Sequence, residues 1–329
     1  VLPIITALPR WINNIFIRAN TKKPLFFGKL LDYRNLIIFA PILIRLLSQK
    51  IKKYKPDETV ISSFAVAKNI YLPATPKHLY IHSPMQYIWS HYSDYLKTMK
   101  PPTRLLFTFC TPYLRRWDKK PRTFETIEAN SLYTANLSQK LYFPDYSIKH
   151  KWHIINDKWN HNKIIRVKYP RIDDAFFYSS ICQQPLDYLV YGWRIARIVK
   201  HVDVLIKASK LANIPIVIVW SWPDEDYCKS IAWSTITFVG WIKDVHQRID
   251  IIKRAKWMVN ITTESFGMVT IESLLLWVPV LWFNKWGTPE LVDKKSGIIL
   301  DSRTINDVSH GMKKLMNSNF DKKYIQERS

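Results

Sequence analysis

The chain has 329 residues, 47% of them hydrophobic, and a formal net charge of +23. This length and hydrophobic content suffice for two domains with buried cores, which excludes a globally disordered chain. No apolar run approaches the roughly 18 residues of a membrane-spanning helix, and the cysteines (Cys110, Cys182 and Cys228) form no C-x-x-C pair, so the composition favours a reducing cytosol.

The positive charge is spread along the whole chain instead of gathering in an arm or a nucleic-acid-binding motif. Lys, Ile and Asn are abundant throughout, as an AT-rich genome would also encode. We therefore expect no specific nucleic-acid partner. Anionic sugar phosphates or anionic lipid headgroups explain the charge equally well.

The first 55 residues are predicted to be mostly helical and to end in the basic run at 50–55. The stretch Leu30 to Leu47 is amphipathic, and two interpretations remain open. It rests on a membrane surface with the lysines near lipid headgroups, or it packs on a sheet with a solvated basic end. The chain begins with Val1 and has no signal-peptide pattern, which we interpret as a fragment.

Strands are predicted at Thr59 to Phe64 and at Leu79 to Ile81, with a helix from about Ala65 between them. The second strand leads directly into His82. A histidine at the end of a parallel strand faces the ligand crevice, where it can donate to a ligand hydroxyl or accept a proton. The alternative is a histidine that only caps a loop.

The boundary between the domains is predicted near residue 168. Ser131 is interpreted as the N-cap of a helix, and residues 144–164 as an irregular insertion or loop. A strand at Val167 to Pro170 then ends at a proline, which is typical of a crossing into a second domain.

The second half begins with a strand, Tyr188 to Tyr191, followed by a basic stretch that holds Arg194, Arg197 and Lys200. A helix is predicted at Val202 to Leu211. The further predicted elements are strands at Ile214 to Val219 and Thr237 to Gly240, and a helix that starts at Pro223. Asp224 and Asp226 match a metal-binding D-x-D, but at a helix N-terminus we interpret them as dipole-complementing acids and predict no metal.

The stretch Asn260 to Val292 predicts a strand, a helix to about Leu276 and a strand at Pro279 to Phe283, and the polar turns that follow the two strands lie at one sheet edge. The helix N-terminus at Ser265, Phe266 and Gly267 is suited to a phosphate. Glu264 and Glu272 lie about 12 Å apart along a helix axis, so that they can hold separate hydroxyls of a long ligand. The tail from Ile305 is predicted to be helical and to fold back over the first domain.

One combination of motifs resembles the donor-binding motif of family 4 glycosyltransferases, which retain configuration and have the GT-B fold. It consists of Glu264-x7-Glu272, Pro279-Val280 and the turn Gly287-Thr288-Pro289-Glu290. The resemblance implies two Rossmann-like α/β domains facing a cleft. The acceptor-side domain, 1–168, is N-terminally incomplete because the family's Gly-rich loop is not visible, and 169–329 is the nucleotide-sugar-binding domain.

The resemblance also implies a role for each candidate residue. Arg194 and Lys200 grip the donor diphosphate, with Arg197 as a rival to Arg194. Glu264 holds the transferred sugar and, with His82, belongs to the catalytic centre. Glu272 binds the ribose, and the rest of the donor site is formed by Ser265, Phe266, Gly267 and Met268. The nucleotide sugar, GDP- or UDP-linked, is the substrate, and neither a cofactor nor a metal is expected.

His82-Ser83-Pro84-Met85 through Trp89 resembles a segment of a mannosyltransferase-like branch that builds O-antigen and related surface glycans. Gln86 stands where that branch has arginine, and Ser90 where it has aspartate. This likeness implies hexose transfer, with mannose as the first guess, to a glycan or polyprenyl-linked acceptor. The expected location is the cytoplasm, with peripheral contact at the inner face of the plasma membrane as one alternative.

Two other classes of function stay open. A phosphorylase or a sucrose-type synthase shares the fold, and would use free phosphate or fructose as a substrate. A non-catalytic basic protein that binds anionic glycans or nucleic acid would bind with a steep salt dependence and without regard to sugar nucleotides.

The chain holds 14 Trp and only 7 Gly. Several tryptophans stand where the resemblance implies glycine: Trp193, Trp220, Trp222, Trp277, Trp282 and Trp286. We hypothesise that the source reads UGA as glycine and that this sequence was translated with UGA as tryptophan. The alternative is a diverged or inactive enzyme, because a bulky indole in a phosphate loop would crowd the donor.

Overall fold

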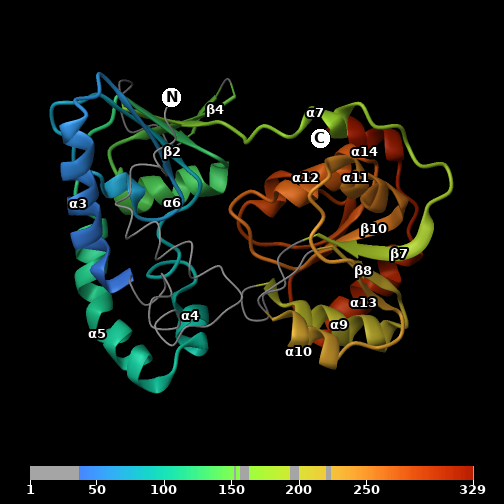
Figure 1. Cartoon of the computed structure of the whole chain (residues 1–329). Coiled ribbons are helices and arrows are strands. Elements are labelled where there is room, and N and C mark those ends of the chain that lie inside the picture. The colour runs from blue at the N-terminus through green and yellow to red at the C-terminus, as the bar shows by residue number, and fades with distance from the viewer. Residues whose placement is uncertain (1–36, 152, 156–162, 193–199, 220–223, 329) are drawn as a thin grey trace. The chain divides into compact units, whose positions relative to one another are not determined.

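The computed structural model describes residues 37–151, 153–155, 163–192, 200–219 and 224–328 (Figure 1). Its contacts divide the chain into two compact units, Val1–Lys168 and Tyr169–Ser329. Several predictions fall outside the described residues: the roles of Arg194 and Arg197, and the glycine hypothesis at Trp193, Trp220 and Trp222.

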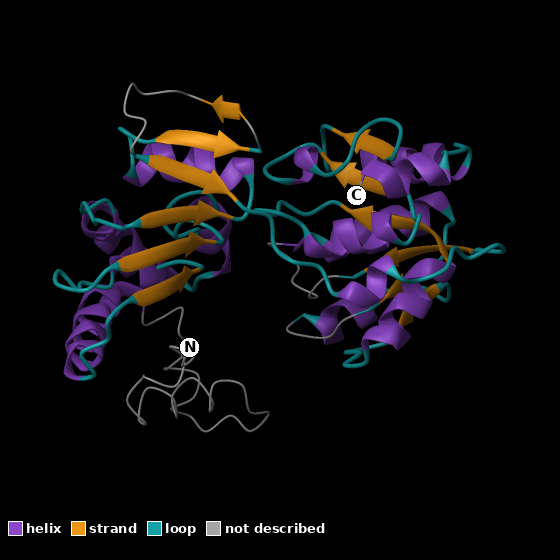
Figure 2. Ribbon diagram, turned by 90° about the horizontal axis from the view of Figure 1, so that it is seen from above, coloured by secondary structure: helices purple, strands orange, loops and turns teal. Residues whose placement is uncertain are grey.

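The first unit is a mostly parallel sheet with helices packed on it, and a β-hairpin forms one edge of the sheet. Its strands are β1 (Thr59–Ser63), β2 (Lys77–Ile81), β3 (Thr126–Ala129), β4 (Ser147–His150), β5 (His153–Ile155) and β6 (Ile164–Val167). Its helices are η2 (Ile37–Phe39), α3 (Ala40–Lys53), η3 (Ala67–Asn69), α4 (Tyr92–Thr98), α5 (Pro101–Asp118) and α6 (Leu132–Tyr142). The strand order is β1-β2-β3-β6-β4-β5, and only the β4–β5 pair is antiparallel among the described strands (Figure 2).

Three sequence predictions for the first unit are wrong. The stretch 144–164 is not an irregular loop throughout, because β4 pairs with β6 inside the sheet and β5 folds back on β4. Its polar residues hide the strand signal because this pair lies at the sheet edge, where one face is solvated. The helix expected from Ala65 is a single 3-10 turn, η3, and the strand expected at 167–170 is β6, which ends at Val167.

Helix α3 has two distinct faces. Ala40, Ile44, Leu47 and Ile51 point into the core of the first unit, while Ile42 and Leu46 on the opposite face are exposed. Packing on the domain therefore accounts for one apolar face only. No described helix combines the length and the hydropathy needed to cross a bilayer.

The second unit is an all-parallel sheet with the order β12-β11-β10-β7-β8-β9 among its described strands. They are β7 (Leu186–Tyr191), β8 (Ile216–Ile218), β9 (Ile236–Phe238), β10 (Ala255–Asn260), β11 (Val280–Phe283) and β12 (Gly297–Leu300). The helices are α7 (Asp174–Phe177), α9 (Val202–Ala212), α10 (Glu225–Ser230), α11 (Val245–Arg254), α12 (Met268–Leu275), η4 (Thr288–Glu290), α13 (Ile305–Met316) and α14 (Lys322–Arg328).

Helices cover both faces of this second sheet. Figure 1 shows α9, α10 and α13 on one side of it and α7, α11, α12 and α14 on the other. Strands β10 and β11 are buried almost throughout, as the middle of a parallel sheet requires, and they form the centre of the core. The tail is helical as predicted, and it packs on its own unit, because α13 lies on α9 and Tyr324 of α14 donates to Asp293.

Candidate functional site

The order of strands in the second unit reverses between β7 and β10. The chain runs from β7 outward to β8 and β9, then returns to β10 beside β7 and continues outward to β11 and β12. Loops that leave neighbouring strands in opposite directions open a crevice at their carboxyl ends, where α/β sheets bind ligands. Lys200 follows β7 and Glu264 follows β10, so both lie at this reversal.

Lys200 and Glu264 form an ion pair across the reversal, with the lysine Nζ on Glu264 Oε1. Both side chains are largely buried, with exposed fractions of 11% and 20%. The next residue, His201, has a left-handed φ of 55°, so the chain turns sharply between Lys200 and α9. Thr262 Oγ1 also donates to Glu264 at 3.0 Å. Lys200 and Glu264 were both predicted site residues, and the structure brings them together.

The loop after β11 meets the same residue. The Gly287 N–H donates to the Glu264 carbonyl at 2.9 Å. A Cβ at Gly287 would lie 2.2 Å from the Ser265 carbonyl oxygen, and a Cβ at Gly192 would lie 2.6 Å from Val269. A side chain at 287 would push its turn away from the Ser265 backbone, and a side chain at 192 would collide with Val269 of α12, so glycine suits both positions.

The N-terminus of α12 lies beside this ion pair. Gly267 occupies the N-cap with φ 109°, a conformation that favours glycine, and no side chain caps the helix in the described structure. Ser265 and Phe266 are buried, and Met268 is 37% exposed. The uncapped N–H groups and the helix dipole form a positive end that suits an anion.

An aromatic residue from the start of the second unit supports this loop. The Tyr169 ring stacks on Phe266 with centroids 5.4 Å apart, and its hydroxyl donates to Glu290 at 3.2 Å. Tyr169 was not identified from the sequence. Its only signal was its place after the proposed crossing between domains.

Glu272 pairs with a different residue, Arg248 of α11, whose Nη2 lies 3.3 Å from Glu272 Oε1. Burial nevertheless raises the pKa of the Glu272 carboxyl from 4.5 to about 7, because desolvation outweighs the attraction to Arg248. Arg248 was not predicted; its signal is an arginine on a helix whose buried face carries Ile249 and Ile252.

His82 lies in the first unit, directly after β2. Its Nε2 lies 2.8 Å from Ser62 Oγ of β1, and its ring meets Tyr80 edge-on with centroids 4.9 Å apart. Burial lowers its pKa below 6.5, so the imidazole is neutral at pH 7. The neutral ring can accept a proton or donate one hydrogen bond, which are the two roles predicted for it.

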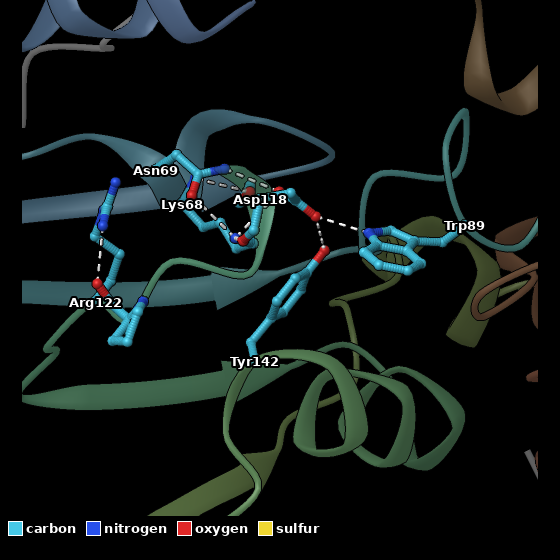
Figure 3. Close-up of polar contacts among 8 residues, drawn as sticks. Lys68, Asn69, Trp89, Asp118, Arg122 and Tyr142 are labelled. Carbon is cyan, nitrogen blue, oxygen red and sulfur yellow. Dashed lines mark hydrogen bonds and ion pairs between the residues drawn. The ribbon is translucent and has the colours of Figure 1, made fainter. Parts of the chain in front are cut away.

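A buried polar cluster, which we call the Asp118 cluster, contacts the loop that begins at His82. It comprises Lys68, Asn69, Trp89, Asp118 and Tyr142 (Figure 3). Asp118 Oδ1 lies 3.2 Å from Lys68 Nζ and accepts from Asn69 at 2.9 Å, and Oδ2 accepts from Trp89 Nε1 at 2.8 Å and from the Tyr142 hydroxyl at 2.6 Å. Asp118 is fully buried and Lys68 is 3% exposed.

The Asp118 cluster joins the loop after His82 to the rest of its unit. Trp89 belongs to that loop, and the Tyr142 hydroxyl interacts with the Met85 backbone. Arg115 of α5 donates to the Ile88 carbonyl at 2.8 Å. Trp89 belongs to the segment that carries the branch likeness, and its bond to Asp118 was not predicted.

Two helix starts appear as predicted. Ser131 caps α6 by accepting from the Thr134 N–H at 3.0 Å. Asp224 occupies the N-cap position of α10, and Asp226 lies in its first turn. The described residues hold no group of His, Cys, Asp and Glu side chains arranged to bind a metal.

Two of the tryptophans that the glycine hypothesis names adopt left-handed backbone conformations. Trp277 follows α12 with φ 60°, and Trp286 precedes Gly287 with φ 61°. Residues with a Cβ pay roughly 1–2 kcal/mol there, and glycine does not. Trp282 lies buried in β11, where its Nε1 has no hydrogen-bond partner in the described structure. These observations support glycine at 277 and 286.

The backbone cost at Trp286 can be measured by comparing two substitutions. Trp286→Gly and Trp286→Ala both remove the indole, but only glycine relieves the left-handed φ. We expect the glycine variant to be more stable than the alanine variant by about 1 kcal/mol in urea unfolding. The matched pair at Trp241, whose φ is not positive, should give the opposite order. An alanine variant at 286 that equals or exceeds the glycine variant contradicts the hypothesis. UGG codons in the gene at 277 and 286 would also contradict it.

The match to a known protein family lies entirely within the second unit. Residues 188–329 match the family model "Glycosyl transferases group 1". No curated protein sequence matches the chain.

Solved structures share the fold at low sequence identity. TarM of S. aureus has a TM-score of 0.58 and 13% identity over 87% of this chain, which spans 54% of TarM. Alr3699/HepE of Anabaena, solved with UDP and glucose, has a TM-score of 0.54 and 16% identity. The match covers 94% of this chain and 83% of Alr3699/HepE. Sucrose-phosphate synthase of Thermosynechococcus elongatus has a TM-score of 0.58 and 15% identity. That match covers 89% of this chain and 72% of the synthase.

These matches show the GT-B fold, with two Rossmann-like units of parallel sheet. The chain spans about half the length of TarM. The predicted fold class is confirmed, and the match to the group 1 glycosyltransferase model is confined to residues 188–329.

Proposed function

We propose that the chain transfers a hexosyl group from a nucleotide sugar to a glycan or lipid-linked acceptor, with retention of configuration. The observation that carries this proposal is the Lys200–Glu264 pair at the strand reversal, beside the uncapped N-terminus of α12. A cation and a helix N-terminus at one place suit a diphosphate, and a carboxylate next to them suits sugar hydroxyls.

Each residue has one task in this proposal. Lys200 and the N–H groups at Gly267 neutralise the diphosphate, and Arg194 is expected to assist from the stretch after β7. Glu264 binds hydroxyls of the transferred sugar. Glu272 binds the ribose, and its partner Arg248 holds the carboxylate in place. His82 serves the acceptor side as a neutral imidazole.

The chemistry needs little more than charge stabilisation. The bond from the anomeric carbon to the diphosphate oxygen breaks while the acceptor oxygen forms a new bond to that carbon, and the acceptor proton leaves to a base. The transition state is oxocarbenium-like, and negative charge accumulates on the departing diphosphate. Cations and amides that are already in place stabilise that charge without reorganisation, which is where such a site gains most of its rate.

The test is a transfer assay of the purified chain with GDP- and UDP-sugars, alone and with glycine restored at 277 and 286. GDP-mannose comes first because of the branch likeness, and UDP-glucose second because Alr3699/HepE was solved with UDP and glucose. Glu272→Ala should lower kcat/KM by about 10- to 100-fold, since it removes charge-assisted hydrogen bonds to the donor.

Two controls accompany Glu272→Ala. Glu272→Gln keeps the shape and part of the hydrogen bonding, and should lose less. Glu225→Ala, which removes the partner of the exposed Lys229 on α10, should leave transfer unchanged. Full activity in a correctly folded Glu272→Ala protein contradicts the ribose-binding role.

A sucrose-type synthase is the second candidate, because sucrose-phosphate synthase shares the fold. The same assay separates the candidates by acceptor, since fructose or fructose phosphate would replace the glycan. A phosphorylase would consume free phosphate. A non-catalytic glycan- or nucleic-acid-binding protein would turn over none of the donors and would bind its anion independently of sugar nucleotide.

A further inference from the structure

The outer surface of α3 and α5, in the first unit, combines exposed apolar side chains with cations. Helix α5 exposes 85% of Phe109, 74% of Leu105, 60% of Tyr113 and 50% of Leu106. These residues recur at spacings of three and four, so they share one face of the helix. On α3, Ile42 is 58% exposed and lies between the exposed Leu46 and the exposed N-cap residue Phe39. Exposed apolar rows on two neighbouring helices are unusual unless a partner covers them.

A groove of about 500 Å³ separates the two helices. Ile42 of α3 and Tyr113 of α5 belong to both the groove and the apolar rows. Four cations line the groove, Arg45, Lys52, Lys120 and Arg122, and none of its described lining residues is acidic. Tyr71 lies between two of these cations, with Lys52 Nζ 5.3 Å and Arg122 5.9 Å from its ring centre.

The charge on the two helices has one sign. Helix α3 carries no acidic residue, and the only acid of α5 is Asp118, which is fully buried inside the Asp118 cluster. Two exposed cations follow the apolar row: Arg116 in the last turn of α5 and Lys120 just after the helix. An apolar face with cations at its margins suits the boundary between acyl chains and anionic headgroups.

We propose that the α3–α5 surface binds an anionic phospholipid bilayer, with the apolar rows at the acyl boundary and a lipid phosphate in the groove. Nucleic acid fits the cations but gives no use for Leu105, Leu106 and Ile42, which cannot stack on bases. A protein partner would have to be acidic and apolar at once. The surface belongs to the first unit and does not depend on the sugar-transfer proposal.

The experiment is co-sedimentation of the whole chain with vesicles of phosphatidylcholine alone or mixed with phosphatidylglycerol. We expect at least about tenfold stronger partitioning onto the anionic vesicles, and weakening as salt rises. The double variant Leu105→Ser/Phe109→Ser, and separately Arg45→Gln/Lys120→Gln, should each lower the partition coefficient by about tenfold or more.

Matched controls come from α9 in the second unit, where Leu211 is 54% exposed and Lys207 and Lys210 are exposed. Leu211→Ser and Lys207→Gln/Lys210→Gln should bind vesicles as the parent does, and all variants should match its circular dichroism and melting temperature. Any of three results overturns the proposal. The parent binds both vesicle types equally, the α5 variant binds as the parent does, or the α9 variants weaken binding as much as the α5 variant does. A dimer that the α5 variant dissociates, with no vesicle binding by the parent, would assign this face to a second copy instead.

Discussion

Replacing Lys200 with methionine is expected to lower kcat by roughly 10²- to 10³-fold. Lys200 is the one described cation that pairs with Glu264 at the strand reversal, and the proposed leaving group is a diphosphate. Removing one preorganised donor to developing charge has an effect of this size in other enzymes. Because the charge develops in the transition state, kcat should fall more than KM rises. Steady-state kinetics with the best donor measures both.

Further variants distinguish the ion pair of Lys200 with Glu264 from its proposed contact with the diphosphate. Lys200→Arg keeps the charge and should retain part of the rate. Lys207→Met removes an exposed lysine of α9 and should change nothing. The double variant Lys200→Met/Glu264→Gln tests whether the lysine only neutralises Glu264. If the double variant recovers the parent's kcat, the proposed contact with the diphosphate is wrong.

Removing the Asp118 carboxylate is expected to produce the largest loss of stability in the chain. Asp118→Ala leaves the buried ammonium of Lys68 without its counterion and removes the acceptor of Asn69, Trp89 and Tyr142. Breaking a buried pair in this way costs about 3–5 kcal/mol. Hydrogen exchange at the amides of β2 and α5 measures the loss within the first unit, because a two-unit chain need not unfold in one step.

Two comparisons test this reading of the Asp118 cluster. Tyr142→Phe removes one charge-assisted hydrogen bond and should cost about 1–3 kcal/mol. The double variant Lys68→Met/Asp118→Leu removes both charges, so it should recover much of the stability that Asp118→Ala loses. A double variant that is less stable than the single one contradicts the assignment of the loss to an uncompensated charge.

The pH dependence of stability gives an independent check on Lys68. Burial lowers its pKa from 10.5 to about 8, against the attraction of Asp118. Between these two values the unfolded chain binds more protons than the folded one, so this group makes stability rise with pH across that window. The rise contributed by Lys68 should be absent from Lys68→Met.

The parts of the fold that were predicted correctly are those whose signal is local. Apolar runs ending in polar turns identified β7, β10 and β11, and the Glu264-to-Glu272 stretch located α12. Buried parallel strands and a glycine-led helix start leave such marks in a short window of sequence. The GT-B fold then followed from the motif likeness, and the structural matches confirm it.

The contacts that the sequence did not reveal join residues far apart in the chain. Arg248 and Glu272 are separated by 24 positions, Asn69 and Asp118 by 49, and Lys200 and Glu264 by 64. A short window of sequence does not show which distant charged or polar side chain will be its partner. The β4–β5 hairpin was missed for another reason, since Lys149, His150 and His153 at a solvated sheet edge look like loop residues.

Glu264 receives three neighbours at once: Lys200 on its carboxylate, Thr262 on the same oxygen, and Gly287 on its carbonyl. The segments that follow β7, β10 and β11 are thereby tied to one residue. It follows that a movement of the Glu264 backbone disturbs these three segments together. Such a movement should register as faster amide exchange at Gly287, whose N–H is bonded to the Glu264 carbonyl.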